Sequence, residues 1–255
     1  MRYEINPKYQ FCKDFLLSIP DRFAKEGRII YQGRNTLKVF EKEELQLCVK
    51  SFKIPHFINQ IAYRYFRKSK AERSFRYATR FVELGVGTPE PVAFIEFHNQ
   101  WGLTQSYYIS LWLPCDFTFR GIATLPVHEQ DSVYRAFTRF TYDFHTKNIF
   151  FTDHSGGNTL LKKTEDGEWH FWLVDVNRTQ FTKVSPEKGL TNFRMLELPD
   201  DKLDVIASEY AKLTNRNPKL FSQELEELTH EHNKHVSHKD WIRDTRRAIK
   251  RRLFH

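Results

Sequence analysis

The sequence predicts an α+β protein of two lobes, a β-rich N-terminal lobe over residues 1–113 and a helical C-terminal lobe over residues 114–255. Apolar runs of strand length dominate the first hundred residues, whereas helical periodicity dominates after residue 128. There is no internal repeat and no linker-like segment, so the lobes join directly near residues 112–116. The interface between two such lobes is where ligands usually bind.

The predicted strands of the N-terminal lobe are rich in Ile, Val, Leu and Phe and are separated by polar turns. They cover residues 28–31, 36–41, 45–52, 92–96 and 107–113. A helix is predicted to begin at Pro55, whose fixed φ suits a first turn, and to continue through Tyr65. A second helical period runs from Ala71 to Val82 and ends at Gly85, since glycine favours the C-terminal end of a helix.

The C-terminal lobe begins with a helix over residues 128–147, whose Val133, Phe137, Phe140 and Phe144 share one face. A hairpin of two short strands follows at 158–163 and 170–175, and helices are predicted at 201–214, 222–232 and 239–254. Four histidines between residues 230 and 238 lack the spacing of a metal site, so this polar stretch is predicted to be a solvated loop.

Composition excludes several classes of protein. With 40% hydrophobic and 15% aromatic residues, the chain is neither disordered nor of low complexity. Its apolar runs are far too short to cross a membrane, and no export signal is visible. Three cysteines without metal-like spacing indicate reduced thiols, which predicts a cytoplasmic protein.

The net charge of +8 is concentrated in two segments. Residues 61–80 contain seven basic side chains and one acid, and residues 239–255 contain seven basic and two acidic side chains. The rest of the chain is slightly acidic. Two local positive patches predict an anionic partner bound at defined places.

One stretch carries the chemistry. Asp153 and Asn158 follow the helix that contains His145, and Asp175 ends the hairpin that comes next. Phosphoryl transfer to a hydroxyl needs a carboxylate beside the acceptor and oxygen ligands for Mg²⁺, and these residues could supply both. The alternative is a surface turn, because Ser-Gly-Gly-Asn strongly favours turns.

The N-terminal lobe offers matching groups. Lys50 ends an apolar strand and suits a point-charge contact to phosphate; the alternative is a solvated lysine at a strand end. Glu72 is a candidate partner for Lys50, although Ser69-x-x-Glu72 is also a capping box, and that alternative stays open. Gly33 and Arg34 lie in the turn that would cover the phosphates, which has one glycine rather than a Gly-x-Gly-x-x-Gly series.

These motifs resemble the protein-kinase-like fold, and the departures are informative. Phe151-Thr152 stands where protein kinases have His-Arg, Ser155 replaces a common lysine, and Val176-Asn177 replaces Phe-Gly. No Ala-Pro-Glu follows. The resemblance therefore indicates a kinase for a small molecule or sugar, without the phosphorylation switch of protein kinases.

More closely, the chain resembles the lipopolysaccharide-core kinase family, whose members phosphorylate Kdo or heptose, in a version typical of Bacteroidetes. The resemblance covers most of residues 28–180 and rests on six segments: Gly33-Arg34-Asn35, Val49–Phe52, Ser69–Phe75, Leu84–Pro91, Asp153-x4-Asn158 and Val174–Arg178. It implies ATP and Mg²⁺ as cofactors and a lipid A–core sugar hydroxyl as the acceptor. The resemblance further implies that the protein acts at the cytoplasmic face of the inner membrane.

When the roles known in the family are carried over by position, each matching residue receives a role. Asp153 would be the catalytic base, and Asn158 and Asp175 would bind Mg²⁺. Lys50, oriented by Glu72, would hold the nucleotide phosphates. Adenine would lie against the connection Leu111-Trp112-Leu113-Pro114.

Residues 239–255 have two interpretations: an amphipathic helix that packs on the lobe, or an interfacial helix on anionic lipid headgroups. The Arg64–Arg80 cluster could serve the same membrane surface or bind acidic groups of the acceptor. Nucleic acid is not expected, because the aromatic residues there (Tyr63, Tyr65, Phe66, Phe75 and Tyr77) recur at helical spacing, as core residues do. The sequence gives neither the phosphorylated hydroxyl nor the oligomeric state. Kinases for other small molecules or for protein, and an inactive binding module, remain alternatives.

Overall fold

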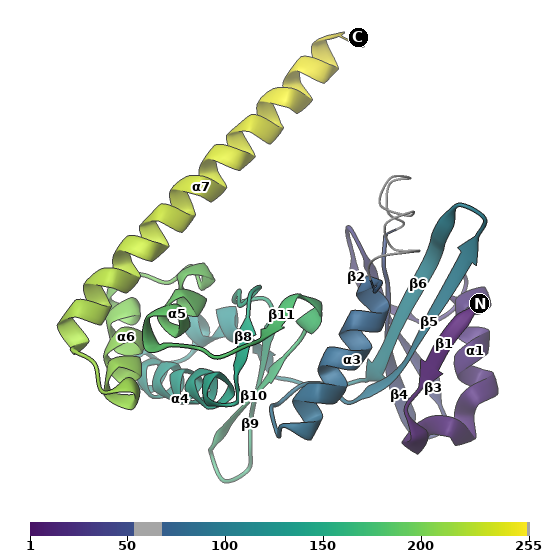
Figure 1. Ribbon diagram of the computed structural model, residues 1–255, viewed down its shortest axis with the longest axis horizontal. Coiled ribbons are helices and arrows are strands. Elements are labelled where there is room, and N and C mark those ends of the chain that lie inside the picture. The colour runs from purple at the N-terminus through teal and green to yellow at the C-terminus, as the bar shows by residue number, and fades with distance from the viewer. Residues whose placement is uncertain (54–67, 254–255) are drawn as a thin grey trace. The chain divides into compact units, whose positions relative to one another are not determined.

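The computed structural model describes residues 1–53 and 68–253, with side chains up to residue 237 (Figure 1). The chain forms two compact units: Met1–Asp116 with Trp172–Thr179, and Phe117–Phe171 with Gln180–His255. The first unit extends past the predicted boundary at residue 113 and also takes in Trp172–Thr179, which the sequence placed in the second lobe. The helix predicted from Pro55 to Tyr65 lies outside the described residues.

The first unit is built on a six-stranded antiparallel sheet of order β1-β5-β6-β4-β3-β2. Its strands are β1 (Arg2–Ile5), β2 (Arg28–Gln32), β3 (Thr36–Lys42), β4 (Leu45–Ser51), β5 (Pro91–Asn99) and β6 (Gly102–Leu111). The predicted strands are confirmed, although β6 begins earlier and ends earlier than expected. The edge strand β1 and the helix α1 (Lys13–Arg22) were not predicted.

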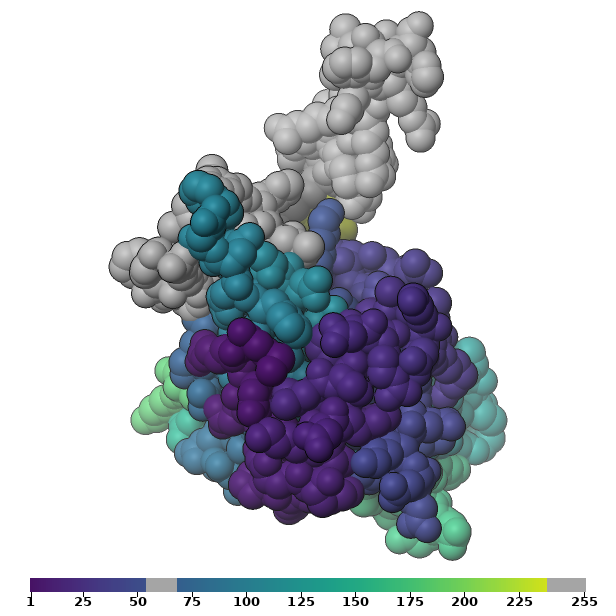
Figure 2. All heavy atoms as spheres, turned by 90° about the vertical axis from the view of Figure 1, so that its right-hand side faces the viewer, coloured from purple at the N-terminus to yellow at the C-terminus, as the bar shows by residue number. Residues whose placement is uncertain are grey.

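The two faces of this sheet have different partners. Leu47 and Val49 of β4 belong to a core cluster with α1 and the 3-10 helix η1 (Pro7–Cys12). Alternation along β4 turns Lys50 to the opposite face, where Phe75 of α3 packs on Phe94 of β5 with ring centroids 5.6 Å apart. Figure 2 shows the N-terminal elements, in purple, as one continuous surface on their side of this unit.

Helix α3 (Lys70–Glu83) has well-defined ends. The Ser69 side chain accepts a hydrogen bond from the Glu72 backbone N–H at 3.0 Å, so the predicted N-terminal cap is present. Gly85 adopts a φ of +66°, and the Val86 N–H donates to the Phe81 carbonyl at 2.8 Å. This is the left-handed helix end for which glycine is suited.

The second unit is mainly helical. It contains α4 (Val127–Thr146), α5 (Pro186–Leu190), α6 (Asp200–Thr214) and α7 (Pro218–Leu253), with short 3-10 helices η2 (Phe119–Thr124) and η4 (Thr191–Met195). Strands β9 (Thr159–Lys163) and β10 (Trp169–Leu173) form the predicted hairpin, with β7 (Phe117–Thr118) beside β9. Strand β8 (Ile149–Phe151) pairs with β11 (Thr179–Phe181). The predicted stripe of α4 is confirmed, because Val133, Phe137 and Phe144 are fully buried.

Helix α7 corrects the prediction of a loop at residues 230–238, since it runs without a break from Pro218 to Leu253. No Gly or Pro follows Pro218, so nothing in the sequence stops the helix. Phe221, Leu225 and Thr229 are buried at a spacing of four, whereas residues 233–237 are exposed. The side chains of the basic segment 239–255 lie outside the described residues. No helix in the described part of the chain is long and apolar enough to span a membrane.

Candidate active site

The chemistry-bearing residues of the first unit centre on an ion pair between Lys50 and Asp175. Lys50 Nζ lies 2.7 Å from Asp175 Oδ1, and the lysine side chain is 13% exposed. Asp175 follows β10 and is anchored to this unit by backbone contacts. The Leu173 N–H donates to the Gly87 carbonyl at 2.8 Å, and the Thr88 hydroxyl donates to the Leu173 carbonyl at 2.8 Å.

The backbone at Asp175 is left-handed, with φ at 58° and ψ at 39°, a conformation that Asp tolerates better than most residues. The turn continues into the 3-10 helix η3 (Val176–Arg178), and the Asn177 side-chain amide donates to Asp175 Oδ1. Both contacts use the same carboxylate oxygen. The carboxylate is thereby fixed in orientation by its own turn and by Lys50.

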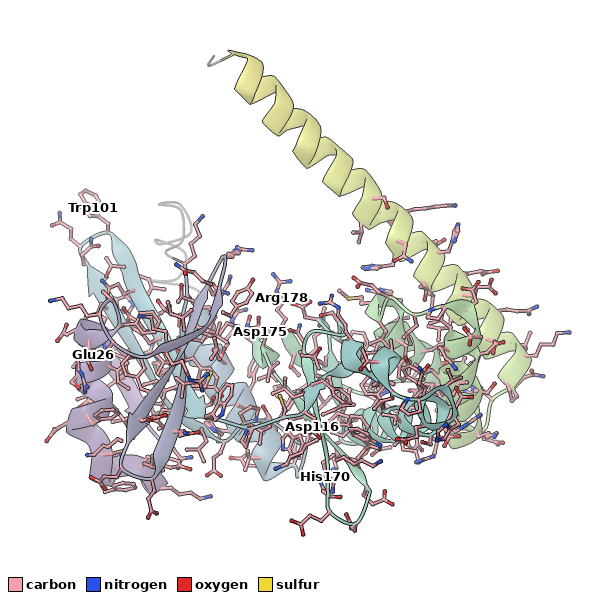
Figure 3. The ribbon with its side chains drawn as sticks, turned by 180° about the vertical axis from the view of Figure 1, so that it is seen from behind. Glu26, Trp101, Asp116, His170, Asp175 and Arg178 are labelled. Carbon is pink, nitrogen blue, oxygen red and sulfur yellow. The ribbon has the colours of Figure 1, made fainter. Side chains whose placement is uncertain are left out.

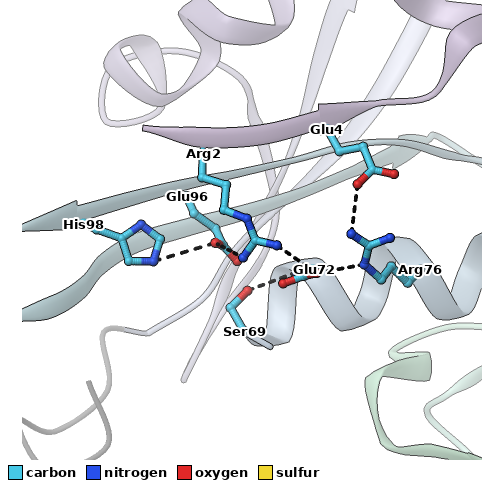
Figure 4. Close-up of polar contacts among 7 residues, drawn as sticks. All are labelled: Arg2, Glu4, Ser69, Glu72, Arg76, Glu96 and His98. Carbon is cyan, nitrogen blue, oxygen red and sulfur yellow. Dashed lines mark hydrogen bonds and ion pairs between the residues drawn. The ribbon is translucent and has the colours of Figure 1, made fainter. Parts of the chain in front are cut away.

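The structure does not pair Glu72 with Lys50, which corrects the prediction of that ion pair. Figure 4 shows the partners that Glu72 has instead. Glu72 Oε1 instead lies 3.0 Å from Arg2 Nη2 and 2.8 Å from Arg76 Nε. Burial raises the pKa of the Glu72 carboxyl, but hydrogen bonds from Arg76 and Arg2 outweigh burial and hold the pKa below its usual value. The physical reason for the correction is that two guanidinium groups already neutralise this buried carboxylate.

Arg2 also bridges to a second buried carboxylate, Glu96 of β5, at 3.5 Å. Glu72 and Glu96 are each 1% exposed, so the N-terminal strand β1 supplies the cation that both acids need. Glu72 is therefore a structural residue that ties α3 to β1 and β5.

A second lysine, Lys70, interacts electrostatically with Asp175. Lys70, the first residue of α3, is affected electrostatically by Arg34, Arg178, Lys50 and Asp175. Burial and the neighbouring cations lower the pKa of Lys70, and only Asp175 opposes them. Sequence reasoning singled out Arg34 but missed Lys70, although Lys70 lies within the basic run at residues 61–80.

The turn predicted to cover the phosphates is closed by its own backbone. The Gly33 N–H donates to the Asn35 carbonyl at 3.1 Å, and Asn35 Oδ1 accepts from the Lys53 N–H at 3.2 Å. The turn is thereby attached to the residues that follow β4. Arg34 lies at its tip and is exposed.

The segment predicted to contact adenine follows β6. The Leu111 N–H donates to the Glu90 carbonyl at 2.9 Å, and the Trp112 N–H donates to the Gln46 carbonyl at 2.8 Å. The Arg28 guanidinium lies 5.6 Å from the centroid of the Trp112 ring. These bonds fix the backbone of Leu111 and Trp112, and the contact of Leu111, Trp112 and Leu113 with adenine remains a prediction.

In the second unit, Asp153 and Asn158 share one turn. The Asn158 side-chain amide donates to the Asp153 carbonyl at 2.8 Å, the Ser155 N–H donates to the same carbonyl at 2.8 Å, and the Asn158 N–H donates to the Ser155 carbonyl at 2.9 Å. Because the Asn158 nitrogen is used within the turn, its Oδ1 is the amide atom left for other chemistry. The structure thus shows that these residues form a turn, and their role in phosphoryl transfer remains a prediction.

His145 supports the strand that leads into this turn. Its ring nitrogens lie 2.9 Å from the Tyr210 hydroxyl and 2.8 Å from Asn192 Oδ1, and the Asn192 amide donates to the Phe151 carbonyl at 2.8 Å. Burial lowers the pKa of His145 to about 4, so the ring is neutral at pH 7. Its role in the structure is to position β8, which precedes Asp153.

His154, next to Asp153, was not singled out as a site residue. It is fully buried among Phe137, Phe144 and Phe151, and neither ring nitrogen has a hydrogen-bond partner among the described residues. Burial lowers its pKa to about 3, so this ring is also neutral. No pattern in the sequence separates it from a surface histidine.

The residues present fit Mg²⁺ and ATP by their chemistry. Asp175 offers a carboxylate and Asn158 an amide oxygen, the hard oxygen donors that Mg²⁺ prefers, and Lys50 offers a cation for phosphate. Within the described residues, no group of three or more His, Cys, Asp and Glu side chains could hold a metal ion by itself. Mg²⁺ is usually bound through one or two carboxylates together with substrate phosphates and water.

No family model and no curated protein matches the sequence. Among solved structures, the chain is similar to WaaP in complex with acyl carrier protein, with a TM-score of 0.60 and 14% identity over 89% of this chain and 99% of that chain. A second similar structure is the PknI kinase domain of Mycobacterium tuberculosis, with a TM-score of 0.38 and 13% identity over 73% and 72%. The likeness to WaaP confirms the predicted fold: the chain has the α+β fold of the protein-kinase-like proteins.

Proposed function

We propose that this protein is an ATP- and Mg²⁺-dependent kinase that phosphorylates a sugar hydroxyl, on Kdo or heptose, of the lipopolysaccharide inner core. The observation that carries the proposal is the Asp153–Asn158 turn, closed by the bond from the Asn158 amide to the Asp153 carbonyl. The Lys50–Asp175 pair supplies the second set of groups that phosphoryl transfer needs.

The proposed reaction assigns one task to each residue. Asp153 accepts the proton of the attacking sugar hydroxyl as its oxygen bonds to the γ-phosphorus, and the bond from that phosphorus to the β-phosphate oxygen breaks to release ADP. Lys50 holds the phosphates. Asn158 and Asp175 would bind Mg²⁺, which when bound neutralises charge on the transferred group.

A sugar acceptor is favoured over a protein acceptor by the strand before Asp153. Phe151 and Thr152 occupy the positions at which a protein kinase has His-Arg, and Phe151 is fully buried in β8. An arginine that would read a phosphorylated activation loop is therefore missing. Regulation of that kind is not needed for a biosynthetic sugar kinase.

The test is a phosphorylation assay on the full chain with Mg-ATP and Kdo–lipid A, read by mass spectrometry. We expect the lipid to gain the mass of one phosphate, and we expect Asp153→Ala to abolish the gain. Asp166→Asn, in the exposed β9–β10 turn, is the matched control and should leave the rate unchanged. Transfer only to protein side chains would overturn the sugar acceptor, and absence of Mg-ATP binding would favour an inactive binding module.

We also propose that the end of α7 contacts an anionic membrane surface. The helix continues to Leu253, and residues 239–255 carry seven basic and two acidic side chains. A basic residue near such a surface contributes about 1 kcal/mol. Removing residues 239–255 should abolish sedimentation with vesicles that contain phosphatidylserine, and unchanged sedimentation would refute this contact.

A further inference from the structure

The Arg120 side chain lies against the turn that contains Asp153. A Cβ atom at Gly156 would be 3.1 Å from Arg120 Cγ, and a Cβ atom at Gly157 would be 3.3 Å from Arg120 Nη1. The aliphatic part of the arginine therefore passes Gly156, and its guanidinium reaches Gly157, the residue before Asn158. Arg120 and the turn belong to the same compact unit.

Gly156 and Gly157 leave room for this contact. Neither glycine has a left-handed φ, so the backbone of the turn does not itself require glycine at these positions. A side chain at either position would crowd Arg120, because separations of 3.1 and 3.3 Å are shorter than ordinary van der Waals contacts. The two glycines are therefore explained by the close approach of the arginine side chain to the turn.

The backbone of Arg120 is held in place by its neighbours in η2. Phe119 and Ile122 are buried, and the centroid of the Phe119 ring lies 4.4 Å from that of Phe137 in α4. The chain enters this unit directly after Asp116, which Figure 3 labels, and η2 follows within a few residues. Packing on both sides of Arg120 therefore fixes the position from which its exposed side chain extends.

The guanidinium has one weak partner among the described residues. Arg120 Nη2 lies 3.4 Å from Glu197 Oε2, and the two side chains are 59% and 64% exposed. An exposed ion pair of this kind contributes little to stability, so a ligand can displace it at small cost. An arginine presents several N–H donors in a rigid planar fork, and Glu197 meets only one side of it. Within the described part of the chain, the remaining donors are available to a ligand.

We propose that Arg120 binds the carboxylate of an acidic acceptor sugar and thereby selects Kdo over heptose. A guanidinium recognises a carboxylate through two parallel hydrogen bonds. Because Arg120 lies on the turn of the proposed base Asp153, an anion that it binds lies near the hydroxyl that is phosphorylated. Kdo carries a carboxylate on the reacting sugar itself, and heptose carries none. The inference rests on the proposed function, in which Asp153 acts on a sugar hydroxyl.

Phosphate is the other oxyanion that a guanidinium binds well. In the proposed reaction, Lys50 and the metal ligand Asp175, both residues of the first unit, serve the nucleotide phosphates. The phosphates of lipid A belong to sugars other than Kdo, so they lie farther from the reacting hydroxyl than the Kdo carboxylate does. The carboxylate is therefore the favoured anion, and the experiment separates it from phosphate.

The experiment measures steady-state phosphorylation of Kdo–lipid A by the full chain, with the concentrations of lipid and Mg-ATP varied separately. Arg120→Gln should raise the KM for the lipid at least about tenfold, because a charge-assisted pair is lost, and should leave the KM for ATP unchanged. Methyl esterification of the Kdo carboxyl group should have the same effect on the unmodified protein. The ester should cause no further loss in Arg120→Gln, since both changes remove the same pair.

Two further variants separate ligand binding from a structural role. Glu197→Gln removes the competing carboxylate and should not raise the KM for the lipid, whereas a purely structural ion pair would make this variant behave like Arg120→Gln. Arg216→Gln is the matched control. Arg216 is an exposed arginine of the same unit that pairs with Glu187 at 3.0 Å, and its loss should leave both KM values unchanged. Thermal unfolding confirms that each variant is folded.

The outcomes are distinct. If the unmodified protein transfers phosphate neither to Kdo–lipid A nor to a heptose-containing acceptor, the proposed function fails. If it phosphorylates heptose alone, or if Arg120→Gln has an unchanged KM for Kdo–lipid A, the inference is wrong while the proposed function stands. Additive losses from the variant and the ester would also overturn the inference. An effect of Arg120→Gln that disappears with dephosphorylated Kdo–lipid A would assign the arginine to a lipid A phosphate and would refute the carboxylate.

Discussion

His154 makes the stability of this protein sensitive to acid. Its ring is fully buried, has no hydrogen-bond partner among the described residues, and has a pKa lowered to about 3. Below the unfolded pKa of 6.5 the unfolded chain binds a proton that the folded chain does not bind. Stability is therefore lost as the pH falls from 6.5 towards 3.

The magnitude follows from the linkage relation. Between pH 7.5 and pH 5, a histidine with a folded pKa of about 3 and an unfolded pKa of 6.5 loses about 2 kcal/mol of stability. His145, with its pKa of about 4, contributes a loss of similar size over the same range. Such losses are a large fraction of the stability of a typical protein.

The assay is urea unfolding followed by tryptophan fluorescence at both pH values. His154→Leu should lose about 2 kcal/mol less than the unmodified chain between pH 7.5 and pH 5. At pH 7.5 it should be at least as stable, since two buried nitrogens without partners are removed. His128→Gln, at a side chain that is 82% exposed, is the control and should leave the pH dependence unchanged. An acid-induced loss in His154→Leu as large as in the unmodified chain would refute the reasoning.

Three further substitutions test packing and electrostatics by urea unfolding at pH 7.5. Ser69→Ala removes the cap of α3 and should cost about 1 kcal/mol, whereas Ser69→Asp should retain most of the stability. Leu225→Ala leaves a cavity where α7 packs and should cost about 2–5 kcal/mol, while the exposed Leu220→Ala should cost little. Arg2→Ala leaves Glu72 and Glu96 buried without their shared cation and should cost about 1–3 kcal/mol, and an unchanged midpoint would contradict the role given to Arg2.

The elements that could be predicted from the sequence depend on local signals. The strands β2 to β4 alternate or run apolar between recognisable turns, and α3 has a capping serine and a terminal glycine. The turn from Asp153 to Asn158 is likewise specified by its own residues, which bond to one another. Such features need no knowledge of distant contacts.

The features that could not be predicted depend on distant partners. Strand β1 is short and mostly exposed, so it has no hydrophobic pattern of its own and exists because it pairs with β5. The partner of Glu72 could not be chosen for the same reason, since Arg2 lies 70 positions away and reaches Glu72 only through that pairing. Helix α7 was divided wrongly because polar residues were interpreted as a loop although no helix-breaking residue is present.

The pairing of Glu72 with two arginines also explains why Lys50 pairs with Asp175. With Glu72 neutralised by Arg2 and Arg76, Lys50 needs another anion because its side chain is 13% exposed, and Asp175 supplies it. Binding of Mg-ATP would break the Lys50–Asp175 ion pair without leaving either charge uncompensated. Lys50 would then contact phosphate, and Asp175 would bind Mg²⁺. It follows that Asp175→Asn should weaken the binding of Mg-ATP more than the binding of metal-free ATP, because it removes a metal ligand and also frees Lys50 for phosphate. Isothermal titration with and without Mg²⁺ measures both affinities, and equal weakening of the two would show that Asp175 does not act through the metal.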